Sequence, residues 1–173
     1  MTLRTRLHAL SAELRRNGRY LDYVLTHKRH VFIAGIRLGV PLWALIVHDW
    51  TKFMPDEWRP YRDRFYPPSG QTAGGITDAL KQFNEATLQH FRRNPHHWQY
   101  WMTGSMNGVL EVFPMPERFV REMVADWIGA AKAQGNGRVS LWWKQKRDRM
   151  KLDYRTRELV DELIDRVEKE NIG

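Results

Sequence analysis

The chain is built around the stretch Ala44-Leu45-Ile46-Val47-His48-Asp49-Trp50-Thr51-Lys52. An apolar run ends there in a histidine and an aspartate that stand side by side. A buried charge without a partner costs several kcal/mol, so such groups are normally paired or bound to a metal ion. The stretch therefore predicts an apolar helix that delivers His48 and Asp49 to the centre of a metal site. In the alternative interpretation, the two side chains form a buried hydrogen bond that only supports the fold.

Helical patterns dominate the rest of the sequence, and strand patterns are nearly absent. Near the start of the chain, leucines recur every three or four residues from Leu3 to Leu14, as on one face of a helix. The sequence predicts an all-α fold, a single domain over residues 1–173 with seven or eight helices in a bundle. The expected boundaries are an N-terminal helix over 1–18 that Asn17-Gly18 ends, an exposed loop over 66–76 and a C-terminal helix over 154–169.

The chain contains no cysteine. This excludes disulfides, cysteine-ligated zinc and thiol nucleophiles, and it fits a cytoplasmic protein. A metal ion would have to be held by His, Asp or Glu. Such ligands suit divalent Mn, Fe, Co, Ni, Zn or Mg.

Basic residues outnumber acidic ones, with 28 Lys and Arg against 20 Asp and Glu. Positive charge favours anionic partners, so we expect a small phosphorylated substrate such as a nucleotide, with nucleic acid as a second candidate. No apolar run approaches the ~20 residues that span a bilayer, and the first residues do not resemble a signal peptide. We therefore expect no membrane association.

Further candidate ligands lie on other predicted helices. His27 precedes the central stretch, His90 follows it, and Asp126 is an isolated carboxylate in an apolar helical segment. His30 follows His27 by about one helical turn, so we expect only one of the two to face the metal. We favour His27 as the ligand and expect His30 near the substrate.

A break in the chain brings two more histidines into consideration. Asn94-Pro95 ends a predicted helix, because the residue before proline avoids the helical region. His96 and His97 follow directly, and the break would allow one of them to turn toward the same centre. Lys52 lies one helical turn after His48, where it could bind a phosphate or a metal-bound oxygen.

The order of these residues resembles the HD-domain superfamily of metal-dependent phosphohydrolases. His27-Lys28-Arg29-His30-Val31 is similar to the first histidine motif of that superfamily. His48-Asp49-Trp50-Thr51-Lys52 resembles its His-Asp-x-x-Lys signature, and Ala125-Asp126 resembles its closing aspartate. The additional histidines, His90 and His96-His97, resemble the subgroup that binds two metals.

Longer segments are similar to a small family of uncharacterised HD-like bacterial and phage proteins. These segments are His48-Asp49-Trp50-Thr51-Lys52-Phe53, Pro55-Asp56-Glu57-Trp58, Asn94-Pro95-His96-His97-Trp98 and Met123-Val124-Ala125-Asp126-Trp127. The similarity extends from about His27 to Leu163.

The resemblance implies one or two divalent metal ions and a set of roles for these residues. It implies a first ion on His27, His48, Asp49 and Asp126, and a second on bridging Asp49, His90 and either His96 or His97. It also implies catalytic roles for Asp49 and Lys52. Candidates for binding the substrate are Lys52, Arg92 and Arg93, through hydrogen bonds to phosphate, and His30. A metal ion there would lower the pKa of its bound water to about 7 and supply a nucleophile at neutral pH.

Three functions are compatible with these features. We favour a metal-dependent phosphohydrolase that acts on a nucleotide or another small phosphate ester. An HD-type di-iron oxygenase is the second hypothesis, since the ligand set also suits iron. The third is a non-enzymatic nucleic-acid-binding or phage accessory protein, which the basic charge favours. The sequence leaves the oligomeric state open.

Overall fold

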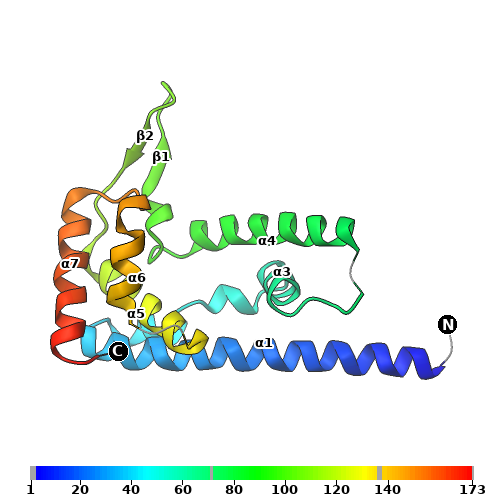
Figure 1. Cartoon of the computed structure of the whole chain (residues 1–173). Helices are drawn as coiled ribbons and strands as arrows, with labels where there is room; N and C mark the ends of the chain where they lie inside the picture. The colour runs from blue at the N-terminus through cyan, green and yellow to red at the C-terminus, as the bar shows by residue number, and fades with distance from the viewer. Residues whose placement is uncertain (1–2, 71, 136–137, 173) are drawn as a thin grey trace. The chain divides into compact units, whose positions relative to one another are not determined.

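The computed structural model describes residues 3–70, 72–135 and 138–172, and within these the chain is mostly helical (Figure 1). The α-helices are α1 (Leu3–Leu38), α2 (Leu42–Val47), α3 (Pro55–Phe65), α4 (Ala73–Arg93), α5 (Glu117–Gln134), α6 (Val139–Lys146) and α7 (Tyr154–Lys169). Short 3-10 helices lie at Trp50–Phe53, Trp98–Trp101 and Arg147–Arg149. The predicted all-α fold with seven or eight helices is confirmed.

The chain divides into two compact units whose segments alternate along the sequence. Unit 1 comprises Met1–Leu25 and Trp50–His90, and unit 2 comprises Thr26–Asp49 and Phe91–Gly173. Helices α1 and α4 each supply residues to both units, which is consistent with the predicted single domain. No helix in the described part of the chain is both long and apolar enough to cross a membrane.

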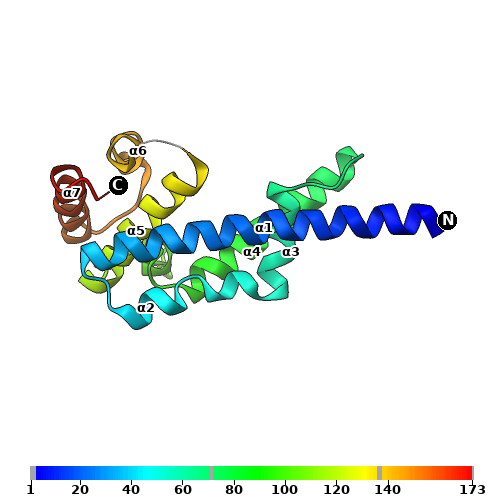
Figure 2. The same ribbon diagram turned by 90° about the horizontal axis from the view of Figure 1, so that it is seen from below.

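Helix α5 is the centre of unit 2. Its side chains Val120, Met123 and Val124 are completely buried, and they belong to one apolar core with Val160 of α7 and Val31 of α1. The core explains why α5 carries apolar residues on most of its surface, since α1, α6 and α7 all pack in the same unit (Figure 2).

A glycine lets α5 approach the second part of α1 closely. A Cβ atom added at Gly129 would lie 2.9 Å from the backbone nitrogen of Val31 and 3.2 Å from the carbonyl oxygen of His27. Only a residue without a side chain fits at this contact. Because Asp126 precedes Gly129 by one turn, the same contact brings Asp126 to the side of His27.

Unit 1 has its own aromatic core. Tyr20 and Val24 of α1 pack with Tyr61 of α3 and Ala86 of α4, all buried. The ring of Trp58 meets Tyr20 edge to face, with 4.7 Å between the centroids. Aromatic residues of this kind provide much of the apolar area that a small core needs.

The predicted end of the first helix at residue 18 is wrong, since α1 continues without a break to Leu38. Asn17 is accommodated in the helix by its side chain. Its amide nitrogen donates to the carbonyl oxygen of Glu13 at 2.9 Å, and its amide oxygen accepts from Trp58 Nε1 at 2.8 Å. Gly18 costs some helix stability, but the packing of Tyr20 and Val24 outweighs that local preference.

The exposed loop is shorter than the predicted range of 66–76. Helix α4 already begins at Ala73, because the Thr72 hydroxyl accepts a hydrogen bond from the Gly75 backbone nitrogen at 3.2 Å and so caps the helix. Residue 71, inside the predicted loop, lies outside the described residues, as do residues 1 and 2 of the predicted N-terminal helix. The C-terminal helix has the predicted bounds, and Asp153 caps it by accepting from Arg155 N at 3.0 Å.

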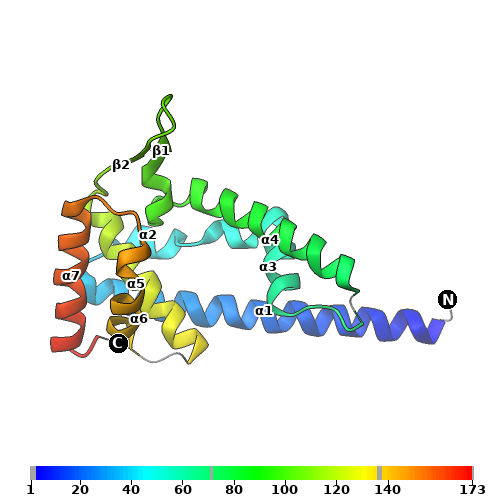
Figure 3. The same cartoon turned by 45° about the horizontal axis from the view of Figure 1, so that its top comes forward.

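A small hairpin in unit 2 has no counterpart among the predicted elements. Strands β1 (Met102–Gly104) and β2 (Leu110–Val112) pair antiparallel, with Met102 opposite Val112 (Figure 3). Gly108 has a φ of +74° in the turn, a conformation that glycine adopts easily. Three-residue strands are too short to produce a recognisable alternating pattern in the sequence.

Candidate metal centre

The end of helix α2 presents the His-Asp pair. The helix stops at Val47, His48 follows in a turn with φ −48° and ψ 128°, and Asp49 has a φ of 54°, in the left-handed region. Aspartate tolerates this region better than most residues do. Lys28 of α1 donates from Nζ to the carbonyl oxygen of His48, and more weakly to that of Ile46 at 3.5 Å. A cation on the last carbonyls of a helix is stabilising, so Lys28 holds the end of α2 against α1.

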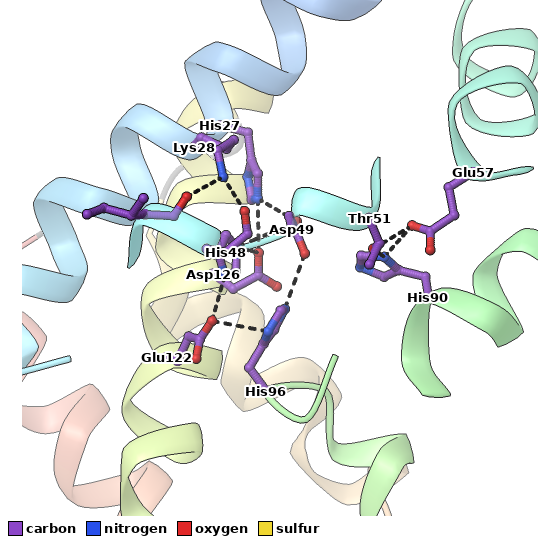
Figure 4. Close-up of polar contacts among 11 residues, drawn as sticks. His27, Lys28, His48, Asp49, Thr51, Glu57, His90, His96, Glu122 and Asp126 are labelled. Carbon is purple, nitrogen blue, oxygen red and sulfur yellow. Dashed lines mark hydrogen bonds and ion pairs between the residues drawn. The ribbon is translucent and has the colours of Figure 1, made fainter. Parts of the chain in front are cut away.

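Four buried side chains of unit 2 converge beside this turn (Figure 4). His27 Nε2 lies 3.0 Å from Asp126 Oδ1 and 3.4 Å from Asp49 Oδ2. His48 Nε2 lies 3.4 Å from the same Asp126 oxygen and 3.5 Å from the same Asp49 oxygen. His27, His48, Asp49 and Asp126 could hold a metal ion, since each offers one ligand atom and these atoms all lie within 4.8 Å of one another. We call this candidate site the metal centre.

The spacing of these atoms fits the ligands of a metal ion. An ion bound tetrahedrally at about 2.1 Å holds its ligand atoms about 3.4 Å apart. Two imidazole nitrogens and two carboxylate oxygens suit divalent first-row metals. In addition, His48 Nε2 is buried and has no hydrogen-bond partner among the described residues. A lone pair in that position is what a metal ligand requires.

Glu122 orients the rings of His48 and His96. It lies one turn before Asp126 on α5 and is buried, and its Oε1 is 2.9 Å from His48 Nδ1 and 3.2 Å from His96 Nδ1. Burial would raise the pKa of Glu122, but the hydrogen bonds from the two histidines outweigh it and lower the pKa to about 2. An ionised carboxylate only accepts, so each Nδ1 donates its proton to Glu122 and each Nε2 faces away from it.

His96 faces the second oxygen of Asp49. Its Nε2 lies 3.4 Å from Asp49 Oδ1, whereas Oδ2 of the same carboxylate faces His27 and His48. Burial would lower the pKa of His96, but hydrogen bonds with Asp49 and Glu122 raise it to about 10. Asp49 therefore presents one oxygen to each side, the arrangement that a bridging carboxylate needs.

The pKa of Asp126 is shifted in the same sense as that of Glu122. Burial would raise it, but the neighbouring imidazole nitrogens of His27 and His48 hold the pKa of Asp126 well below its ordinary value. Asp126 is thus ionised at neutral pH.

The other predicted residues of unit 2 lie in different surroundings. His97 follows His96, its ring is 5.0 Å from that of Phe91, and one of its nitrogens lies within 4.8 Å of ligand atoms of Asp49 and His96. His30 is half-buried and does not belong to any of the ligand clusters in the described part of the chain, which leaves His27 as the histidine of that turn in the metal centre. Arg92 and Arg93 are exposed at the end of α4.

Two predicted residues belong to unit 1. Lys52 is half-buried in the 3-10 helix after the His-Asp turn. His90 is buried on α4, where its Nδ1 lies 2.8 Å from Glu57 Oε2. The Thr51 hydroxyl donates to the same Glu57 oxygen at 2.9 Å (Figure 4). Glu57 therefore contacts Nδ1 of His90 in the same way as Glu122 contacts Nδ1 of His48. The role of His90 as a metal ligand stays a prediction.

Sequence reasoning missed Glu122 and Glu57. It treated Asp126 as the isolated carboxylate of its helix, which is wrong because Glu122 is also buried on α5. The separation of four residues between Glu122 and Asp126, within an apolar segment, was the available signal, since it places both on one face of the helix.

A family model described as "Family of unknown function (DUF5662)" matches residues 16–169 of the chain. No curated protein and no solved structure matches the chain.

Proposed function

We propose that this chain, which belongs to the DUF5662 family of unknown function, is a metal-dependent phosphohydrolase. Its substrate in this proposal is a nucleotide or another small phosphate ester, and its location is cytoplasmic. The observation that carries the proposal is the convergence of two imidazole nitrogens and two carboxylate oxygens in the buried metal centre. The resemblance of the same residues to the HD-domain superfamily supports it.

Each residue of the metal centre has a role in this proposal. His27, His48, Asp49 and Asp126 would hold a divalent ion of the series Mn, Fe, Co, Ni, Zn or Mg. Such an ion, when bound, lowers the pKa of a water molecule and neutralises phosphoryl oxygens. Glu122 keeps the ring of His48 in the tautomer that leaves Nε2 unprotonated.

The second oxygen of Asp49 supports a second ion. Oδ1 of Asp49 and Nε2 of His96 lie 3.4 Å apart, the same separation as between ligand atoms of the metal centre. His97 is the proposed further ligand in unit 2. His90 is retained as a ligand from the sequence prediction alone.

Basic residues are the proposed phosphate-binding groups. Lys52, His30, Arg92 and Arg93 are the candidates, because Lys and Arg bind phosphate through charge-assisted hydrogen bonds. The excess of eight basic over acidic residues favours an anionic substrate.

Hydrolysis with one defined metal tests the proposal. The purified chain is freed of metal, reloaded with each divalent ion in turn and assayed against a panel of nucleotides and simple phosphate esters. We expect metal-dependent release of phosphate that falls at least 100-fold in Asp126→Asn. Asp165→Asn, a change of the same chemistry at an exposed position of α7, should keep wild-type activity.

Other outcomes point to the other two functions. Bound iron with oxygen uptake and no hydrolysis would identify a di-iron oxygenase. Nucleic-acid binding that weakens steeply with salt, without any hydrolysis, would identify a nucleic-acid-binding protein. Either result would contradict the proposed phosphohydrolase activity.

A further inference from the structure

Helix α1 exposes a row of leucines along its part in unit 1. We call this row the leucine stripe; its members are Leu3, Leu7, Leu10, Leu14, Leu21 and Leu25, with exposed fractions of 76%, 58%, 61%, 72%, 40% and 52%. The first turns of α1 extend beyond α3 and α4 of the same unit (Figure 1). Large exposed apolar areas of this kind mark interaction sites on soluble proteins.

The leucine stripe is straight and lies on one side of the helix. At about 100° per residue, its six members fall within a sector of about 60°. From Leu3 to Leu25 it extends over about 33 Å, at 1.5 Å per residue. The core of unit 1 uses other positions of the helix, Tyr20 and Val24. A straight apolar stripe on a helix matches the surface of a second helix.

The spacing of the stripe is symmetric about Leu14. Leu3 and Leu25 are each 11 residues from Leu14, and Leu7 and Leu21 are each seven residues from it. Leu10 and Gly18 are each four residues from Leu14, and a Cβ added at Gly18 would meet nothing within 4 Å. Two copies of α1 that cross antiparallel at Leu14 therefore match position for position. The matched pairs are Leu3 with Leu25, Leu7 with Leu21, Leu10 with Gly18, and Leu14 with itself.

Charges beside the stripe favour the same arrangement. Arg4 and Asp22 are exposed and lie on the same edge of the stripe, at opposite ends. In an antiparallel pair, Arg4 of each copy comes near Asp22 of the other, so the attraction occurs twice. In a parallel pair, these edges of the two copies would lie on opposite sides of the interface, so this attraction would be absent.

We infer that the leucine stripe is the interface of an antiparallel homodimer, with its two-fold axis at Leu14. This inference is independent of the metal centre, which lies in unit 2. A partner helix from another protein would not need the symmetric spacing or the matched charges. A second copy of this chain accounts for both.

Cysteine cross-linking tests the direction of pairing, and the chain is suited to it because it has no cysteine of its own. Leu14→Cys should cross-link to itself with a short thiol reagent and double the chain mass of 20.6 kDa. Leu3→Cys should not, since its two copies would lie about 33 Å apart. A mixture of Leu3→Cys and Leu25→Cys chains should cross-link. Self-cross-linking of Leu3→Cys as readily as Leu14→Cys would show parallel pairing and overturn the inference.

The mass in solution tests whether the dimer exists. Light scattering coupled to size exclusion should give a dimer for the full wild-type chain and a monomer for Leu14→Glu. Leu88→Glu, at an exposed leucine on α4, should remain a dimer. Circular dichroism melts confirm that each variant is folded. The single changes Arg4→Asp and Asp22→Arg should each weaken the dimer, and the double variant that carries both should restore it. A monomeric wild type overturns the inference.

Discussion

Glu122 Oε1 and His48 Nδ1 lie 2.9 Å apart, and this contact decides which nitrogen of the histidine faces the metal centre. Because the carboxylate is ionised, it accepts a hydrogen bond from Nδ1–H, and Nε2 keeps its lone pair. Glu122 contacts His96 in the same way at 3.2 Å. One buried glutamate thus orients the rings of two histidines.

Replacing Glu122 should weaken metal binding without removing a ligand. In Glu122→Gln the acceptor charge is lost, and the ring of His48 is no longer held in one tautomer. Changes to such orienting groups typically cost 10- to 100-fold in metal affinity, and we expect a loss in this range. Isothermal titration of the metal-free protein measures it, with Glu111→Gln on the exposed hairpin as the control. An unchanged affinity would mean that Glu122 serves only the fold.

The same glutamate should make the stability of the metal-free protein depend on pH. The pKa of Glu122 is about 2 in the folded chain against 4.5 when unfolded, so its stabilising contribution is present above pH 4.5. It should be lost as the pH falls toward 2, by about 3 kcal/mol in all. Urea unfolding in chelator at pH 6, 4 and 3 measures the slope. The free energy of unfolding of Glu122→Gln should fall less over this pH range than that of the wild type. An equal fall in both proteins would contradict the assignment of this pH dependence to Glu122.

Filling the space at Gly129 should separate α5 from α1. A Cβ atom there meets the backbone of Val31 and His27, which cannot move aside as a flexible side chain could. We expect Gly129→Ala to lower the free energy of unfolding by about 1–3 kcal/mol and to weaken metal binding. Thermal melts and metal titration measure the two effects. Gly74→Ala, where a Cβ meets nothing within 4 Å, should not reduce either quantity.

Removing the cation of Lys28 should loosen the turn that presents His48 and Asp49. Lys28→Met keeps the length of the side chain but no longer binds the last carbonyls of α2. The expected cost is about 1 kcal/mol of stability and a several-fold weaker metal affinity. Arg29→Met, one residue further on and exposed, is the matched control. Equal metal affinities in the two variants would exclude a positioning role for Lys28.

Features that depend on local sequence pattern could be predicted from the sequence. Helical spacing and the lack of strand patterns predicted the all-α fold, and the C-terminal helix over 154–169 has the predicted bounds. The polar residues at the end of an apolar run predicted that His48 and Asp49 are buried, and both are. A charge in an apolar segment is informative because burial without a partner is costly.

Features that depend on tertiary packing could not be predicted in the same way. Asn17 and Gly18 usually end a helix, but a hydrogen bond from Trp58 and the packing of Tyr20 keep α1 intact. Whether Glu122 is buried or solvated depends on the histidines opposite it, which come from distant segments. The leucines of α1 show the limit most clearly, since their spacing identifies one face of a helix but not what covers it.

The metal content of the purified protein tests the central claim most directly. Plasma mass spectrometry on the chain purified without chelator should find at least one divalent first-row ion per molecule. Asp49→Ala should retain the helical content of the wild type and lose that ion. A wild-type chain that binds no divalent metal, or an Asp49→Ala variant with unchanged metal content, would contradict the metal centre of His27, His48, Asp49 and Asp126.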